Sequence, residues 1–234
     1  MDLIPKHLQD LNERQKEAVC YTDGPLLVFA GAGSGKTRVL TRRIAHLIYT
    51  HQANPLEIFA VTFTNKAARE MIGRISKLHQ FTRVPMWVAT FHSACVRILR
   101  PNAKLLDFGP NFVIYDSNDS LSALKRVYKA LKIDKSHLDL SFALNQIDSA
   151  KNKYLDPEEV KKNLEQFGNK GTLIAEVFEA YQNELQRANA MDFGDLLCHT
   201  LTLLKLNPNV RKRYQQQFKH ILVDEYQDTN HVQY

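Results

Sequence analysis

Four short apolar runs stand out along the chain, and each is rich in β-branched or aromatic residues. This pattern is typical of strands that are buried on both faces of a parallel sheet. Amphipathic segments separate the first three runs, one over residues 36–49 and another that Asn65 is expected to cap. The alternation of strands and helices predicts an α/β fold with a doubly wound parallel sheet. The predicted strands are residues 26–30, 58–63, 86–90 and 220–224.

The middle of the chain has a different pattern, because residues 116–190 show almost no strand signal but several helix starts. Asp116 or Ser117 can cap one helix. Asp156 followed by Pro157 marks another, since proline is favoured at the first helical position. We therefore predict that a mostly helical insertion interrupts the α/β domain. The predicted first part of that domain, the insertion and the second part are residues 1–100, 101–190 and 191–234.

The composition of the chain favours a polyanionic partner and gives no sign of a membrane span or a cysteine metal site. The chain has 234 residues and a formal charge of +6, with a pI near 9.1, which favours a polyanionic partner. No apolar run is long enough for a membrane span and no signal peptide is recognisable, so we expect a cytoplasmic protein without a membrane partner. Cys20, Cys95 and Cys198 form no metal-binding pair, and we expect them to be reduced and buried.

The segment "AGAGSGKT", residues 30–37, carries the strongest chemical signal. It fits a phosphate-binding P-loop except that Ala30 stands where the pattern has glycine. Lys36 is expected to reach the β and γ phosphates and Thr37 to bind Mg²⁺, while the following helix directs its positive N-terminus at the anion. The alternative is a flexible Gly/Ser turn. The loop residues expected to surround the phosphates are Gly31, Ala32, Gly33, Ser34 and Gly35.

Two acids follow the last predicted strand, in "ILVDEYQDTN". In P-loop proteins a second acid that organises the metal lies at the tip of a neighbouring strand, which suits Asp224. Glu225 would then polarise the attacking water, and Gln227 would position or sense the γ phosphate. We therefore predict a catalytic set of Lys36, Asp224, Glu225 and Gln227, with Mg²⁺ held by Thr37 and Asp224.

The choice of base depends on Gln15, in "LNERQKEAV". Its amide can donate and accept together, which is how glutamine recognises adenine. A guanine reader would need N-K-x-D, and "TNKAA" has Ala68 where the aspartate belongs. ATP is therefore favoured over GTP as the nucleotide.

Six motifs together resemble the opening region of the superfamily 1 DNA helicases of the UvrD, Rep and PcrA type. The resemblance covers almost the whole chain and is weakest over residues 101–190. It implies a RecA-like domain 1A interrupted by a helical subdomain 1B, and ATP-driven 3′ to 5′ translocation on single-stranded DNA with duplex unwinding. The motifs are "LNERQKEAV", "AGAGSGKT", "VTFTNKAAREM", "VATFHSACVRILR", "MDFGDLL" and "ILVDEYQDTN".

The resemblance also implies roles for single residues. Arg38 would pack against the adenine or ribose, and an exposed Phe63 would stack on bases. At Gly194 the chain departs from the family, which usually has a second acid there, so no carboxylate role is expected at that position. The residues assigned to the single-strand groove are Thr62, Phe63, Thr64, Asn65, Thr90, His92 and Ser93.

Basic residues near these motifs are candidates for DNA phosphates, and the basic segment 125–135 is a candidate for duplex DNA. A solvated helix face is the alternative for each. If DNA contact is real, binding should weaken steeply with salt. The first group is Lys66, Arg69, Arg74, Lys77, Arg97, Arg100 and Lys104.

The later motifs of the resembled family do not occur in this sequence. We therefore expect an N-terminal fragment that binds nucleotide but hydrolyses it poorly, because a second RecA-like domain of the same polypeptide would supply the transition-state arginines. Three other readings stay open: a P-loop phosphotransferase, a non-catalytic nucleic-acid-binding module, and a helicase-nuclease subunit.

Overall fold

The computed structural model describes residues 5–21, 24–79, 83–134, 136–163 and 169–234. These residues form two compact units. Unit 1 comprises the described residues of Met1–Ala94 and Arg211–Asp228, and unit 2 comprises those of Cys95–Val210 and Thr229–Tyr234. Lys135, at the end of the basic segment considered above, lies outside the described residues.

A three-stranded parallel sheet with the order β2-β1-β5 forms the centre of unit 1. Its register pairs Thr62 with Thr90 and Val61 with Val223, so the carboxyl ends of the strands meet at one edge. Three of the four predicted strands and the mixed α/β class with a parallel sheet are confirmed. The strands are β1 (Ile58–Thr62), β2 (Trp87–Thr90) and β5 (His220–Val223).

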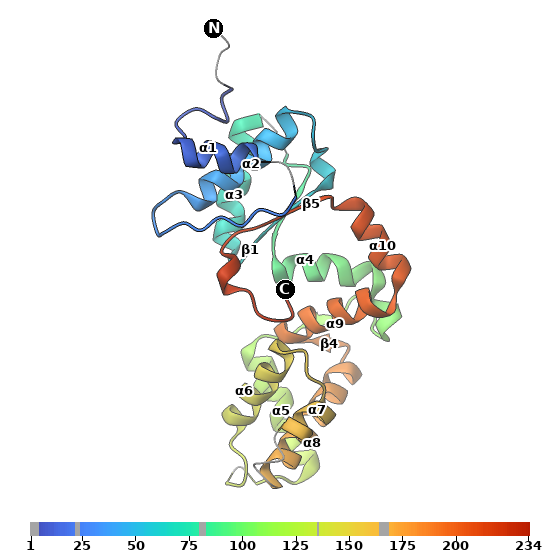
Figure 1. Ribbon diagram of the computed structural model, residues 1–234. Helices are drawn as coiled ribbons and strands as arrows, with labels where there is room; N and C mark the ends of the chain where they lie inside the picture. The colour runs from blue at the N-terminus through green and yellow to red at the C-terminus, as the bar shows by residue number, and fades with distance from the viewer. Residues whose placement is uncertain (1–4, 22–23, 80–82, 135, 164–168) are drawn as a thin grey trace. The chain divides into compact units, whose positions relative to one another are not determined.

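The two faces of this sheet carry different cores because successive strand residues point to opposite sides. Ile58 and Ala60 are fully buried on the face covered by α2 (Lys36–Tyr49) and α3 (Asn65–His79). On the other face, the Phe59 ring contacts Trp87 and Phe218. Figure 1 shows α2 and α3 beside the strands.

The predicted strand over residues 26–30 is wrong. The segment has no regular secondary structure, and its apolar side chains are exposed, with Phe29 at 90% of its full surface. A strand requires backbone pairing with a neighbour. Among the described residues, β5 pairs with β1 and no strand pairs with 26–30. The apolar run therefore indicated a strand that this structure does not form.

Local signals explain the remaining helices of unit 1. Asn12 accepts a hydrogen bond from Gln15 N while the Gln15 side chain accepts from Asn12 N, which is a complete capping box for α1. Asn65 does not cap α3 as predicted; Thr64 Oγ1 instead accepts from Ala67 N, and Asn65 is the first helical residue. The other helical segments are α1 (Glu13–Cys20), η1 (Pro55–Glu57), η4 (Tyr226–Asp228), and α4 (Phe91–Leu99) and α10 (Pro208–Gln217), which contain residues of both units.

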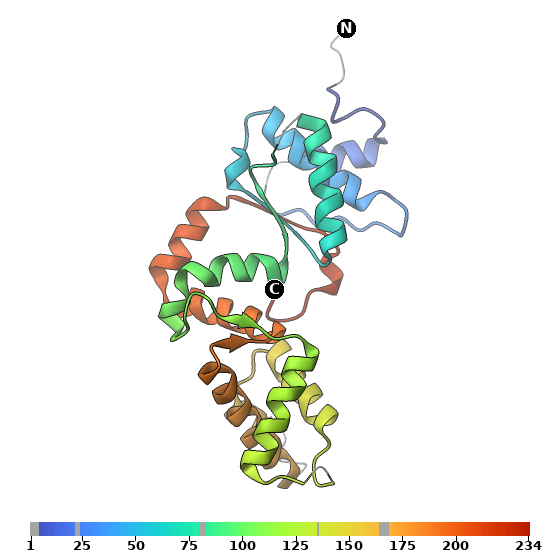
Figure 2. The ribbon, with the colours of Figure 1, turned by 180° about the vertical axis from the view of Figure 1, so that it is seen from behind.

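Unit 2 is mostly helical, and α5, α6, α7 and α8 pack together in it (Figures 1 and 2). Asp116 caps α5 through a capping box and Pro157 begins α7, as predicted. Two short parallel strands, which the sequence pattern did not indicate, pair Val113 with Ala190. The elements are η2 (Arg100–Leu106), β3 (Val113–Ile114), α5 (Ser117–Leu131), α6 (Leu140–Asn152), α7 (Pro157–Asn163), α8 (Asn169–Arg187), β4 (Ala190–Met191) and α9 (Phe193–Leu206).

A buried ion cluster lies in unit 2, where Lys151 of α6 meets the start of α9. Lys151 Nζ lies 2.7 Å from Asp192 Oδ2 and 2.7 Å from Asp195 Oδ1, and its side chain is 2% exposed. Tyr181 and Gln182 of α8 donate further hydrogen bonds to the two carboxylates. Burial would lower the pKa of Lys151, but the two carboxylates outweigh it and leave that pKa raised. The cluster thus joins α6 to the start of α9 through buried ion pairs, and α8 to both through hydrogen bonds.

Gly194 owes its place to the same cluster. A Cβ at this position would lie 2.8 Å from Lys151 Cδ, closer than real side chains approach. The buried lysine therefore explains the glycine at the position where the resembled family usually has an acid.

The compact units do not share the predicted domain boundaries, since residues 191–210 group with the helical unit. The division into domains 1A and 1B stays a prediction. All three cysteines are free, but only Cys95 is buried as expected, whereas Cys198 is partly buried and Cys20 is exposed. Within the described ranges, no helix is both long and apolar enough to cross a membrane.

Candidate nucleotide and nucleic-acid sites

The predicted phosphate loop has the conformation that its glycines allow. Gly33 and Gly35 have φ values of 74° and 89°, in the left-handed region that side chains disfavour. The N-cap of α2 is Gly35, which has no side chain to cap the helix. The first backbone N–H groups of α2 are therefore available to an anion. Ser34 Oγ donates to Gly31 O at 2.6 Å, which closes the turn. Ala32 is exposed at its tip.

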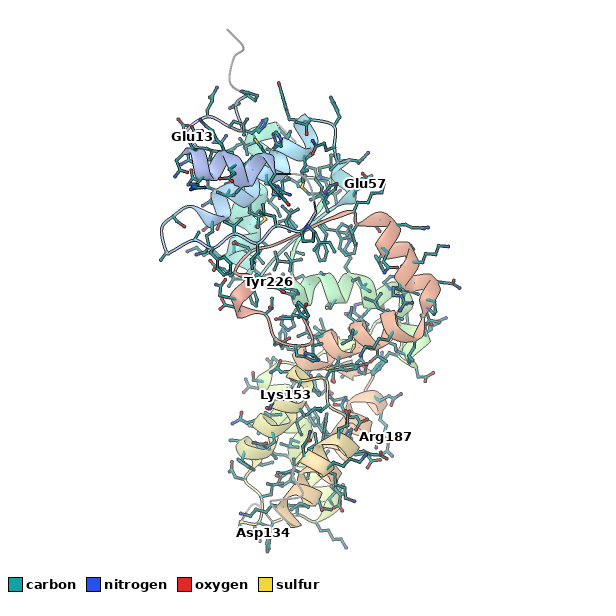
Figure 3. All side chains as sticks on the ribbon, viewed as in Figure 1. Glu13, Glu57, Asp134, Lys153, Arg187 and Tyr226 are labelled. Atoms are coloured by element: carbon teal, nitrogen blue, oxygen red, sulfur yellow. The ribbon has the colours of Figure 1, made fainter. Side chains whose placement is uncertain are left out.

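Side chains from the loop and from the end of β5 meet in unit 1. Thr37 Oγ1 donates to Asp224 Oδ2 at 3.2 Å, and Lys36 Nζ lies 3.8 Å from Glu225 Oε2. Gln227 Nε2 donates to Glu225 Oε2 at 2.5 Å. The four predicted catalytic residues and the predicted metal pair therefore share one neighbourhood. Figure 3 labels Tyr226, in the turn that follows the two acids.

The two acids differ in environment. Asp224 is buried, and burial raises its pKa, while the hydrogen bond from Thr37 opposes the rise. Glu225 is partly exposed and has a φ of 52°, a conformation that is uncommon for residues other than glycine. The chain turns sharply here, so consecutive acids point to different partners: Asp224 to Thr37 and Glu225 to Lys36 and Gln227.

Oxygen donors at this point match the requirements of a magnesium ion. The Thr37 hydroxyl and the Asp224 carboxylate are already adjacent, and hydroxyl and carboxylate oxygens suit this hard cation. The residues present therefore fit the ion that the sequence predicts.

Gln15 supports the loop directly. Its Nε2 donates to Ser34 O at 2.9 Å, and its Oε1 accepts from Asn12 N. An amide has a second N–H and a second lone pair, so these contacts leave capacity for a base edge. Arg38 lies in the first turn of α2, and its Nη2 is 3.9 Å from Asp10 Oδ2.

An open cavity of about 730 Å³ adjoins the loop in unit 1. Its lining contains several cations from α2 and α3 that the sequence did not connect with a nucleotide. Their signal was the spacing of Arg38 and Arg42 on one helix face, together with Arg74 and Lys77 on the neighbouring helix. The lining residues are Lys6, Gly31, Gly33, Gly35, Lys36, Thr37, Arg38, Thr41, Arg42, Arg74, Lys77, Leu78 and Glu225.

The predicted single-strand residues follow β1 and β2 at the same sheet edge but differ in accessibility. Thr62 and Thr90 are 1% and 6% exposed and accept backbone hydrogen bonds in their own turns. Phe63, predicted to be exposed, is instead half-buried against Phe91. His92 is also half-buried, and burial lowers its pKa. The exposed members are Thr64, Asn65 and Ser93. Thr62 and Thr90 therefore shape the edge, while the other five can reach a ligand.

The sequence interpretation missed Phe91. Its ring lies 5.4 Å from the Phe63 ring, between centroids. The register that pairs Thr62 with Thr90 brings these rings together, since each follows one of the paired residues. A repeated Thr-Phe at two strand ends was the signal that could have found it. Arg100, by contrast, is engaged within unit 2, where it donates to Pro110 O and stacks on the Phe112 ring.

Comparison with known proteins identifies the family of this chain. The family model described as the UvrD/REP helicase N-terminal domain matches residues 11–234. The chain belongs to the UvrD/REP helicase family. The resemblance drawn from the six motifs is thereby confirmed.

Curated relatives in this family are similar along nearly the whole chain. The ATP-dependent DNA helicase PcrA of Leuconostoc citreum is 46% identical over 225 residues, which cover 96% of this chain and 30% of the relative. The ATP-dependent DNA helicase UvrD1 of Mycobacterium leprae is 44% identical over 234 residues, with 99% and 30% covered. The chain therefore spans about 30% of the length of these relatives. The roles of the individual site residues stay predictions.

Proposed function

We propose that this chain is the N-terminal motor region of an ATP-dependent DNA helicase, which binds Mg²⁺-ATP and single-stranded DNA. In the complete protein, ATP hydrolysis drives 3′ to 5′ translocation and duplex unwinding. The observation that carries the proposal is the meeting of Thr37 with Asp224 and of Lys36 with Glu225 beside an uncapped helix N-terminus. Family membership and the names of the relatives support it.

The nucleotide's phosphates are held by this chain's own groups. Backbone N–H groups of the loop and the α2 N-terminus bind phosphate oxygens, and Lys36 exchanges its contact with Glu225 for the β and γ phosphates. Thr37 and Asp224 hold the Mg²⁺ ion, which when bound neutralises charge on the β and γ phosphate oxygens. Glu225, released from Lys36, orients the attacking water, and Gln227 reports on the γ phosphate.

Adenine recognition is assigned to Gln15 and Arg38. The contact between Gln15 and Ser34 O links the reader of the base to the loop that holds the phosphates. A base that engages the amide therefore also adjusts the loop. Because a glutamine amide pairs with the edge of adenine, Gln15 favours ATP over GTP as the substrate.

Single-stranded DNA is assigned to the edge that follows β1 and β2. Phe63, with Phe91 against it, offers a base-stacking surface, and Thr64, Asn65, His92 and Ser93 provide polar groups for the backbone. Because β1, β2 and β5 belong to one sheet, the DNA edge and the catalytic acids share a rigid support. Duplex DNA and a second RecA-like domain of the same polypeptide are further proposed partners, and a cytoplasmic location belongs to the same proposal.

The test is a titration of the chain with Mg²⁺-ATP and Mg²⁺-GTP, each with and without an oligothymidine strand, following binding and phosphate release together. We expect selective ATP binding that responds to the DNA, with little turnover. Equal binding of the two nucleotides without any response to DNA would contradict the proposal. The variant Phe63→Ala should weaken oligothymidine binding by about 1–3 kcal/mol, and the exposed Phe142→Ala of unit 2 is the control.

A further inference from the structure

The wall of the cavity beside the phosphate loop carries positive charge well beyond the loop itself. Arg38 and Arg42 lie four residues apart on α2 and so share one helix face. Arg74 and Lys77 lie three apart on α3, which packs against α2. Two neighbouring helices therefore present cations to the same space, and α3 contributes nothing to the loop.

Arg42 lies farther along α2 than the residues that bind phosphate at the loop. Arg42 comes six positions after Lys36, which corresponds to about 9 Å along a helix axis. Lys36 and the helix N-terminus serve the phosphate chain at one end. An anion beside Arg42 is therefore a different phosphate group from those at the loop, and Arg74 and Lys77 line the same cavity.

The chain itself neutralises little of this charge. Among the described residues that line the cavity, six are Lys or Arg and one, Glu225, is acidic. Glu225 faces Lys36. The contacts of Arg38 with Asp10, 3.9 Å long, and of Arg74 with Glu70, 3.7 Å long, are largely exposed and so screened by water. Burial, followed by repulsion from Arg38, lowers the pKa of Arg42. A bound anion would relieve that repulsion.

We propose that Arg42, Arg74 and Lys77 form a second phosphate subsite in this cavity, distinct from the phosphate loop. It takes a phosphate group carried on the ribose 3′ position of a bound nucleotide, or free inorganic phosphate. Guanidinium and ammonium groups together suit a phosphate because they donate several charge-assisted hydrogen bonds. The inference rests on the proposed binding of a nucleotide at the loop. Arg74 and Lys77, which their sequence positions made candidates for DNA phosphates, would then bind the nucleotide instead.

The experiment compares adenosine 5′-diphosphate with its 3′-phosphorylated form by calorimetry, in the presence of Mg²⁺. The variant Arg74→Gln/Lys77→Gln removes two exposed side chains from the cavity wall without touching the loop. Arg69→Gln is the matched control, because Arg69 is exposed on the same helix and does not line the cavity. A second arm adds inorganic phosphate to protein saturated with Mg²⁺-ATP.

For a nucleotide-borne phosphate, the 3′-phosphorylated form binds about tenfold more tightly to the wild type and to Arg69→Gln. The double variant loses that preference but keeps its affinity for the diphosphate. For free phosphate, the second arm shows additional binding that the double variant loses. If the wild type binds the diphosphate but shows neither the preference for the 3′-phosphorylated form nor the additional binding of phosphate, the subsite alone is overturned. A double variant that loses only its affinity for DNA also overturns the subsite. Absence of any diphosphate binding contradicts the proposed function and the subsite with it.

Discussion

The Thr37 hydroxyl donates a hydrogen bond of 3.2 Å to Asp224 Oδ2, joining residues that lie 187 positions apart in the chain. One belongs to the first turn of α2 and the other follows β5, so the contact exists only because the sheet is assembled. If this pair holds Mg²⁺, its two oxygens must both be present. The contact is therefore a direct link between the fold and the chemistry proposed for it.

Replacing Thr37 by valine removes the hydroxyl and keeps the side-chain shape. We expect the affinity for Mg²⁺-ATP to fall about tenfold or more, with little change in the affinity for ATP without the metal ion. Calorimetric titrations at several Mg²⁺ concentrations measure both. Thr50→Val at the end of the same helix is the control and should behave as wild type. A loss of equal size with and without Mg²⁺ would exclude the proposed metal role.

Replacing Lys151 by methionine leaves two buried carboxylates without their cation. We expect a loss of about 3–5 kcal/mol in the free energy of unfolding, because an uncompensated buried charge is costly. Urea denaturation followed by circular dichroism gives the value. The exposed neighbour Lys153, labelled in Figure 3, provides the control, since Lys153→Met should change stability by less than about 0.5 kcal/mol. Equal stability of the two variants would contradict the structure of the cluster.

Two glycines in helices should respond to alanine with opposite signs. A Cβ at Gly194 meets Lys151 Cδ at 2.8 Å, so Gly194→Ala should cost about 1–3 kcal/mol of stability. A Cβ at Gly73 in α3 would meet nothing within 4 Å, so Gly73→Ala should gain about 0.5–1 kcal/mol. Thermal denaturation of the two variants beside the wild type tests the difference. A stabilised Gly194→Ala protein would show that Lys151 does not occupy that space.

Stability should fall in mild acid because His7 is partly buried against His46 of α2. Burial, followed by repulsion from His46, His79 and Arg42, lowers the pKa of His7 to about 4. The unfolded chain takes up a proton near pH 6.5, whereas the folded chain does so only near pH 4. The contribution of neutral His7 to the free energy of unfolding is therefore complete above about pH 6.5, and it is lost as the pH falls towards 4.

Unfolding free energies measured between about pH 4 and 7 check this prediction. His7→Gln should flatten the acid side of the profile, because the residue that resists protonation is gone. His51→Gln, at an exposed position, should leave the profile unchanged. An unaltered profile in His7→Gln would assign the acid sensitivity to other groups.

The parts of the fold that local chemistry determines could be predicted from the sequence. The boundaries of α2, the Asp116 cap and the Pro157 helix start depend on a few adjacent residues, and the structure has them as predicted. The run over residues 26–30 looks like the other three apolar runs, but a strand also needs a partner, and no local pattern reports one. The exposed Phe29 shows the limit of that reasoning.

Some residues of the candidate site could likewise be predicted from the sequence and others could not. The loop and the two acids could be found because each is a recognisable motif, and the sheet brings them together. The cations Arg42, Arg74 and Lys77 could not be assigned from sequence, since a basic helix face is usually only solvated. Lys151 and Asp192 lie 41 positions apart in the chain, and the only sign of their contact in the sequence is the glycine at 194.

The most direct test of the account is the affinity of the chain for Mg²⁺-ATP, measured by calorimetry for the wild type and for Lys36→Ala. The phosphate loop with its partner acids is the centre of the proposal, and Lys36 is its main cation. We predict that the wild type binds a single equivalent of Mg²⁺-ATP and that Lys36→Ala binds it at least about tenfold more weakly, while both unfold at similar temperatures. Equal affinities in the two proteins, or no binding by a folded wild type, would contradict the account.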